Sequence, residues 1–262
     1  MPRVRHQLRR RHEAVNRLDR LMQHQNQILL VHYSCESFYD RKDGRSPRVT
    51  SIAVRNLGQN QSTSFSIHQI AERGGVASPD IAREYDRLEK LMLEEFYEFV
   101  RYHANYDWLH WNMRDANYGF AAIEHRYRVL GGTPTAISEE RRTDIAALLI
   151  DIYGTGYAPH PRLASLIKLN SISLLGFLSG EEEAAAFEAG DYVRLHQSTL
   201  RKVDVFVNIL NRAWDGTLKT KARWYEQYGT SVGGIIEVTT DHWLYKLLGF
   251  LGIVASLIAL LR

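Results

Sequence analysis

Residues 27–39 read QILLVHYSCESFY, and the interpretation of the whole chain starts from them. Four apolar residues at 28–31 lead toward the short sequence Ser34, Cys35, Glu36. A short apolar run of this kind is typical of a buried strand in an α/β sheet. Ligands and metals in such proteins bind beside the carboxyl ends of the strands. We therefore predict that Glu36 is a functional carboxylate, the alternative being a solvated carboxylate at a strand end.

The composition predicts one principal domain. The chain has 262 residues, of which 45% are hydrophobic, enough for one core of roughly 200 residues with appendages. Cys35 is the only cysteine, which excludes a disulfide within the chain and favours a reducing, cytoplasmic compartment. The formal charge of +3 is concentrated at the amino terminus, because seven arginines and only two acidic residues lie within residues 1–20. Attraction to nucleic acid or anionic lipid therefore has to come mainly from this arm or from local patches.

The order of the predicted elements is three strands, a helix, a strand and a helix. Two turns rich in glycine and polar residues separate the first three strands, which favours an antiparallel meander. The helix that follows has an apolar face at helical spacing, and the fourth strand is short and aromatic. After the first strand, the elements are expected at 48–55, 63–67, 81–103, 108–111 and 116–130.

Several stretches resemble one known family. Residues 93–100 read LEEFYEFV, and residues 108–131 read WLHWNMRDANYGFAAIEHRYRVLG. A helix at 192–210 carries Asp204. In the order of their predicted elements and in the kinds of residues within them, residues 27–212 resemble the DEDD superfamily of 3′–5′ exonucleases, whose members have a ribonuclease H-like fold. The resemblance implies a mixed sheet flanked by helices.

The same resemblance implies a two-metal site, from which this sequence departs. The family's first aspartate is Ser34 here, its glutamate is kept as Glu36, its second aspartate falls at Gly119, and its last is kept as Asp204. Two-metal phosphodiester hydrolysis needs several carboxylates around ions about 4 Å apart. The family's general base is replaced by Thr199 or Leu200, so metal binding is expected to be weak.

We nevertheless expect any catalysis to use Mg²⁺ or Mn²⁺. Asp115 precedes Gly119 by about one helical turn and is the expected substitute acid, with Asp107 and His196 as alternatives. The predicted catalytic residues are Glu36, Asp115 and Asp204, and Glu36 and Asp204 are the predicted metal ligands. The residues expected to bind a ligand are Ser34, His110, Asn112 and Tyr118.

Other chemistries find little support in the sequence. The eleven histidines form no i, i+4 pair with an acid and have no cysteine partners, so a zinc site is not expected. The glycine pairs fit turns rather than a phosphate-binding loop, and no GxSxG motif is present. Residues 180–190, GEEEAAAFEAG, are expected to form a helical turn whose charges face solvent.

Both ends of the chain carry amphipathic or apolar sequence. Residues 1–26 predict a basic amphipathic helix, which would pack on the domain, lie on an anionic membrane or contact phosphates. Residues 243–262 read WLYKLLGFLGIVASLIALLR and span about 28 Å as a helix, close to the hydrocarbon thickness of about 30 Å. Small residues four apart, such as Gly252 and Ser256, let such helices approach closely.

These observations predict four segments: the basic helix at 1–26, a ribonuclease H-like domain at 27–215, a connector at 216–242 and a single-pass tail anchor at 243–262. The predicted function is binding of nucleic acid or a nucleotide by a degenerate exonuclease-like domain that lies in the cytoplasm and is tethered to a membrane. Two alternatives stay open. One is a membrane effector whose tails form a homo-oligomer, and the other is an active metal-dependent 3′–5′ nuclease.

Overall fold

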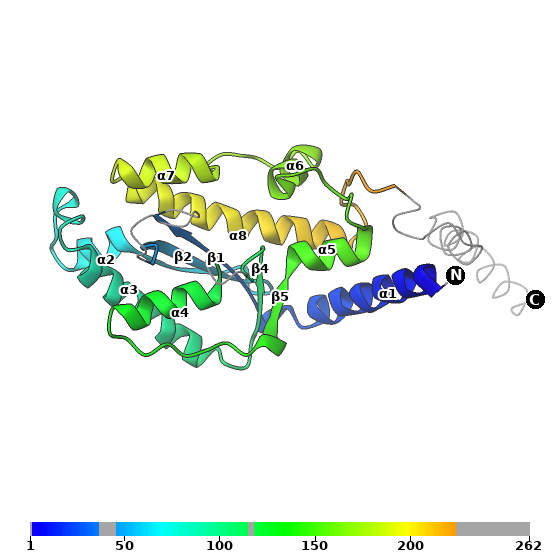
Figure 1. The fold of residues 1–262 in the computed structure, drawn as a ribbon, viewed down its shortest axis with the longest axis horizontal. Coiled ribbons are helices and arrows are strands. Elements are labelled where there is room, and N and C mark those ends of the chain that lie inside the picture. Colours follow the sequence, from blue (N-terminus) through cyan, green and yellow to red (C-terminus); the bar gives the residue numbers. More distant parts are fainter. Residues whose placement is uncertain (1, 37–45, 115–117, 224–262) are drawn as a thin grey trace, which may run out of the picture. The chain divides into compact units, whose positions relative to one another are not determined.

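The computed structural model describes residues 2–36, 46–114 and 118–223 (Figure 1). The strands are β1 Ile28–Cys35, β2 Val49–Asn56, β3 Ser62–Ser66, β4 Asp107–His110 and β5 Arg142–Asp144. The α-helices are α1 Pro2–Gln23, α2 Ile67–Arg73, α3 Tyr85–Tyr102, α4 Phe120–Val129, α5 Ile145–Tyr153, α6 Arg162–Leu169, α7 Gly180–Glu188 and α8 Tyr192–Trp214. Short 3-10 helices lie at Gln25–Gln27, Ser78–Asp80 and Glu139–Arg141.

The five strands form one mixed sheet in the order β3-β2-β1-β4-β5. β1 and β2 pair antiparallel, as do β2 and β3, whereas β1 pairs parallel with β4 and β4 with β5. This arrangement confirms the predicted α/β class, the central position of the first strand and the antiparallel meander of the first three strands.

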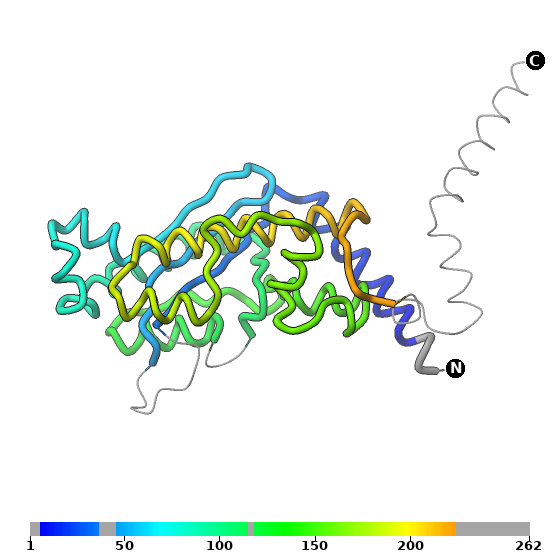
Figure 2. Tube along the Cα trace, turned by 90° about the horizontal axis from the view of Figure 1, so that it is seen from above, coloured from blue at the N-terminus to red at the C-terminus, as the bar shows by residue number. Residues whose placement is uncertain are grey.

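β1 is buried over its whole length because helices cover both faces of the sheet. Alternate side chains, from Leu29 to Cys35, join the hydrophobic core on the side of α3 and α4. The intervening residues His32 and Ser34 contact α8, which runs across β1 and β2 (Figure 2). Since successive side chains of a strand point to opposite faces, both sets are enclosed by protein. The strand therefore continues past the apolar run at 28–31, and Ser34 lies inside it.

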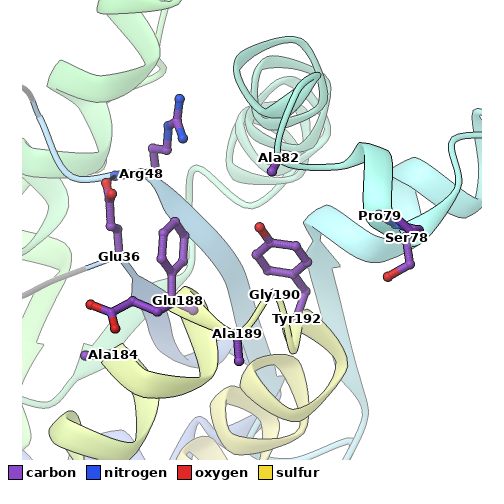
Figure 3. A pocket seen from close by; sticks show the side chains of 11 residues that line it. Glu36, Arg48, Ser78, Pro79, Ala82, Ala184, Glu188, Ala189, Gly190 and Tyr192 are labelled. Atoms are coloured by element: carbon purple, nitrogen blue, oxygen red, sulfur yellow. Dashed lines mark hydrogen bonds between the residues drawn. The ribbon is translucent and has the colours of Figure 1, made fainter.

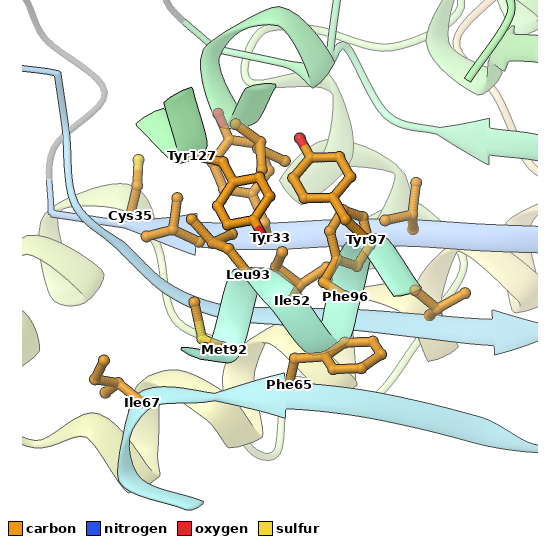
Figure 4. Packing of buried hydrophobic residues seen from close by; sticks show 14 of the residues in the cluster. Tyr33, Cys35, Ile52, Phe65, Ile67, Met92, Leu93, Phe96, Tyr97 and Tyr127 are labelled. Atoms are coloured by element: carbon orange, nitrogen blue, oxygen red, sulfur yellow. The ribbon is translucent and has the colours of Figure 1, made fainter. Parts of the chain in front are cut away.

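Aromatic side chains fill the core between the sheet and α3 (Figure 4). Tyr97 stacks on Tyr127 of α4 with ring centroids 4.9 Å apart, and Phe96 meets Trp108 of β4 edge to face. Such offset and edge-to-face arrangements are the favoured geometries of aromatic pairs. Because the Trp108 side chain is fully buried, this part of the aromatic fourth strand belongs to the core.

Three element boundaries differ from the predicted ones. The helix expected from residue 81 begins at Tyr85, since a turn follows the 3-10 helix Ser78–Asp80. Residue 67 starts α2 instead of ending β3, and this seven-residue helix was not predicted. The helix expected from residue 116 begins at Phe120 within the described residues.

The described chain folds as two units. One unit contains residues 19–148 and 166–219 and holds the whole sheet. The other includes residues 2–18, 149–165 and 220–223. In this second unit, Arg10 of α1 forms an ion pair with Asp151, and the backbone N–H of Lys221 donates to the carbonyl of Tyr157. Helix α1 confirms the predicted helix at the amino terminus.

None of the helices within the described ranges is long and apolar enough to cross a membrane. The predicted tail anchor at 243–262 lies outside these ranges, as does most of the predicted connector.

Candidate functional site

A cavity of about 800 Å³ lies at the carboxyl end of β1, where Glu36 follows the strand (Figure 3). Its wall combines the ends of β1 and β2 with the 3-10 helix Ser78–Asp80 and the turn between α7 and α8. The polar and aromatic side chains of the lining are Glu36, Arg48, Ser78, Phe187, Glu188 and Tyr192. We call this cavity the Glu36 pocket.

A β-bulge sets the position of Glu36 and Arg48. Ser34 pairs with Ser51, but Cys35 pairs with Val49, so Thr50 is the extra residue in β2. The hydroxyl of Thr50 donates to the carbonyl of Ser34, which fixes the bulge. Beyond it, the backbone N–H of Glu36 donates to the carbonyl of Arg48 at 2.8 Å. Bulges redirect side chains and are common beside functional sites.

The Arg48 side chain is held by neighbours on α3. Its guanidinium lies 4.9 Å from the centre of the Tyr85 ring, and its Nε lies 3.5 Å from the Asp86 carboxylate. The same Asp86 oxygen accepts from Arg126 at 2.7 Å. Arg126 in turn pairs with Glu89, whose carboxylate also accepts from the backbone N–H of Val49. A chain of charged groups therefore links the buried Glu89 to the guanidinium in the pocket.

Three aromatic rings lie together beneath the pocket. Tyr85, Phe187 and Tyr192 have pairwise centroid distances of 5.8 to 6.0 Å and meet edge to face. Burial raises the pKa of both tyrosines, so each hydroxyl is a neutral group at physiological pH. Phe187 lies at the end of α7 and Tyr192 at the start of α8. The turn between them reverses the chain at Gly190, whose φ of 70° suits glycine.

A second polar cluster is buried between β1, β2, α7 and α8. The Glu183 carboxylate accepts from Ser34 at 3.0 Å and from Ser198 at 2.9 Å, and its Oε1 lies 2.6 Å from Nζ of Lys202. Ser34 also shares a hydrogen bond with Thr199. Ser34, Glu183 and Ser198 are fully buried, so this cluster lies in the core. The Ser34 side chain is therefore enclosed by protein, which argues against its predicted role in binding a ligand. Because Glu183 is buried, the charges of residues 180–190 do not all face solvent, as had been expected.

The structure does not bring Glu36 and Asp204 together. Asp204 Oδ1 lies 2.6 Å from Nη1 of Arg55, and Arg55 is paired with Leu30. Glu36 lies six residues beyond Leu30, which corresponds to about 20 Å along an extended strand. The two predicted metal ligands therefore lie near opposite ends of β1, too far apart to share a pair of ions.

A complete acid cluster is also missing from the part of the chain that the structure describes. No three histidine, cysteine, aspartate or glutamate side chains converge there in a way that could hold a metal ion. Asp115, the predicted substitute acid, lies outside the described residues.

His110 and Asn112 lie at the end of β4, away from the Glu36 pocket. Both lie beside Asp144, the last residue of β5. Asp144 was not predicted as a site residue. The backbone N–H of Asn112 donates to Asp144 Oδ1 at 3.0 Å, and His110 is paired with Asp144 across the sheet. His110 is also paired with Val31, five residues before Glu36, or about 16 Å along the strand.

Tyr118 lies closer to β1. Its ring stacks on Tyr33 with centroids 4.8 Å apart, and its hydroxyl lies 3.4 Å from Nδ1 of His32. The sequence reasoning missed Arg48, Phe187, Glu188 and Tyr192, which line the pocket. The helix start at Asp191 marks the turn beside Glu188 and Tyr192, because its side chain caps α8 just after Gly190.

Because His110 is buried, we expect the protein to become less stable in acid. Its Nδ1 accepts from the backbone N–H of Met113 at 3.1 Å, which requires a neutral ring, and burial lowers the pKa of His110 from 6.5 to about 4. Between these pH values His110 binds a proton in the unfolded chain more readily than in the folded one. The free energy of unfolding therefore falls as the pH falls from about 6.5 to 4, by about 3 kcal/mol at most. Urea unfolding across this range measures the effect. His110→Gln should make the curve less steep, whereas exposed His125→Gln should not. Equal curves for the two variants would contradict the assignment.

Comparison of the chain with models of known families, with curated proteins and with solved structures gave no match.

Proposed function

We propose that this protein binds a nucleotide, free or at the end of a nucleic acid strand, in the Glu36 pocket. The observation that carries the proposal is the composition of this one cavity, in which a guanidinium, two carboxylates and two aromatic rings line about 800 Å³. Pockets for small ligands have volumes of about 300–1,000 Å³ and a few convergent polar groups. The position at the carboxyl end of the central strand is also where α/β proteins bind ligands.

Each chemical group of a nucleotide has a counterpart in the lining. Arg48 offers a planar, permanently charged fork for phosphate oxygens, and its contacts with Tyr85 and Asp86 hold it in place. Phe187 and Tyr192 offer aromatic surface on which a base stacks. Glu36 and Glu188 accept hydrogen bonds from ribose hydroxyls or from the amino group of a base.

The geometry favours binding over cleavage. A two-metal nuclease needs its carboxylates around one pair of ions. Here Glu36 and Asp204 are separated by most of the length of β1, and Asp204 is engaged by Arg55. Without a shared metal site for these two acids, the alternative of an active 3′–5′ nuclease loses its main support.

The ribonuclease H-like relationship remains part of the proposal. It is supported by the order of elements along the chain, which is three strands, a helix pair, a strand and a helix before β5. It is also supported by the antiparallel pairing of the first three strands and the parallel pairing of β4 beside β1.

The proposal predicts that Arg48→Gln weakens nucleotide binding. A hydrogen bond to a charged group contributes about 1.5–3 kcal/mol, so the dissociation constant should rise about 10- to 100-fold. Fluorescence anisotropy with labelled mononucleotides and a short single-stranded oligonucleotide, at fixed salt, measures it. The matched control is Arg73→Gln, since Arg73 is exposed and pairs with Glu95 outside the pocket. Absence of binding by the unmodified protein, or equal affinities for both variants, would refute the proposal.

We also propose that residues 243–262 hold the domain at a membrane with the domain in the cytoplasm. The support is the apolar run of that sequence and the basic residues Lys219, Lys221 and Arg223 that precede it. Val254→Lys places a charge at the centre of the run and should move the protein to the soluble fraction of a cell lysate. Val254→Ile is the control. If the lysine variant stays with membranes, the anchor is wrong.

A further inference from the structure

Two histidines from distant parts of the sequence meet on the α8 side of the domain. His68 belongs to α2 and His196 to α8, and their ring centroids lie 5.1 Å apart with the planes inclined by 49°. His196 is 7% exposed, and His68 is half-buried. Neither residue belongs to the lining of the Glu36 pocket.

Each ring has a nitrogen that lacks a hydrogen-bond partner among the described residues. These atoms are Nδ1 of His68 and Nε2 of His196, and both are shielded from solvent. An unsatisfied buried polar atom is destabilising, so two such atoms in one contact require an explanation.

The separation of the rings matches the geometry of a shared metal ion. With a metal–nitrogen distance of about 2.1 Å and the ring centre about 1.1 Å farther, each centroid lies about 3.2 Å from the ion. At a tetrahedral angle of about 109°, two such centroids are about 5.2 Å apart. The observed 5.1 Å agrees with this value.

A carboxylate lies close to the pair. The exposed carboxylate of Glu72, one helical turn after His68, contributes negative charge beside it. A metal ligand must be deprotonated, and neutral imidazole suits zinc, copper and nickel.

We propose that His68 and His196 form a binding site for a divalent transition metal, for which zinc is the probe. Within the described residues no third histidine, cysteine or acidic side chain converges on the two rings, so water completes the coordination. An ion held by α2 and α8 joins the end of the meander to the long helix that covers the sheet. The site is independent of nucleotide binding in the Glu36 pocket.

The experiment is titration of the metal-free full chain with zinc, followed by calorimetry and by thermal unfolding. The unmodified protein should bind one zinc ion at this site and unfold at a higher temperature when zinc is present. His68→Gln and His196→Gln should each weaken binding at this site at least 10-fold and remove the temperature shift. Cobalt in place of zinc should give visible absorption bands that both variants lack.

The matched control is His125→Gln, because His125 is an exposed histidine on α4. This variant should bind zinc and shift in unfolding temperature as the unmodified protein does. The proposal fails if the unmodified protein shows no zinc-dependent shift, or if the shift survives in both His68→Gln and His196→Gln. Circular dichroism without zinc establishes that the variants fold, so a lost shift reports on the metal and not on misfolding.

Discussion

Lys202→Met is expected to lower the free energy of unfolding by about 3–5 kcal/mol. Lys202 Nζ lies 2.6 Å from a carboxylate oxygen of Glu183, and Glu183 is fully buried. Methionine preserves much of the side-chain volume but removes the charge. The glutamate would then be an uncompensated buried anion, with Ser34 and Ser198 as its side-chain donors among the described residues. Removing one member of a buried ion pair is costly for this reason.

Urea unfolding at pH 7 measures this loss as a lower midpoint at an unchanged slope. The control is Lys90→Met, because Lys90 is exposed on α3 and should change stability by less than about 0.5 kcal/mol. In the double variant Glu183→Gln with Lys202→Met, no charge is buried, so much of the stability should return. Equal stability of Lys202→Met and Lys90→Met would show that the Glu183–Lys202 pair contributes nothing to folding.

The second large effect is expected for Arg126→Met. Arg126 donates to both carboxylate oxygens of Glu89 and also to Asp86, and the Glu89 side chain is fully buried. Burial raises the pKa of Glu89, and Arg126 opposes this shift. Losing the arginine leaves a buried anion between α3 and β2, so we expect a loss of about 3–5 kcal/mol.

Arg126→Met should also weaken ligand binding in the Glu36 pocket, because Asp86 loses the partner that helps orient it toward Arg48. The control lies two residues away: Arg128 is exposed and pairs with Glu124 within α4, so Arg128→Met should leave stability and affinity nearly unchanged. Denaturant unfolding and the anisotropy assay measure the two effects. Two variants of equal stability would mean that the Glu89 pair contributes nothing to folding.

Local pattern was sufficient to predict the first four strands of the sheet, but not the three-residue strand β5. The apolar run at 28–31, the alternating residues of 48–55 and the polar turns between them predicted strands within a few residues of β1 and β2. These signals depend on side-chain periodicity and turn chemistry, both of which are local. The burial of His32 and Ser34 against α8 was not predicted, because both side chains are polar.

The site was harder to predict because its parts are distant in sequence. Glu36 was identified from its place after a buried strand, and it does line a pocket. Its neighbours Glu188 and Tyr192 come from a turn about 150 residues later, and no local pattern connects them to β1. The acidic residues of α7 read as a solvent-exposed face, but Glu183 is buried because Lys202 lies one turn beyond Ser198 on the facing helix.

The two edges of the sheet are short and polar. β5 has three residues, and β3 has five, four of which are serine or threonine, with its first two residues exposed. Edge strands of this kind offer few unpaired backbone groups to another chain. Two copies of this domain are therefore poorly suited to joining by backbone pairing into a continuous intermolecular sheet, which protects the protein from fibrous aggregation at high concentration.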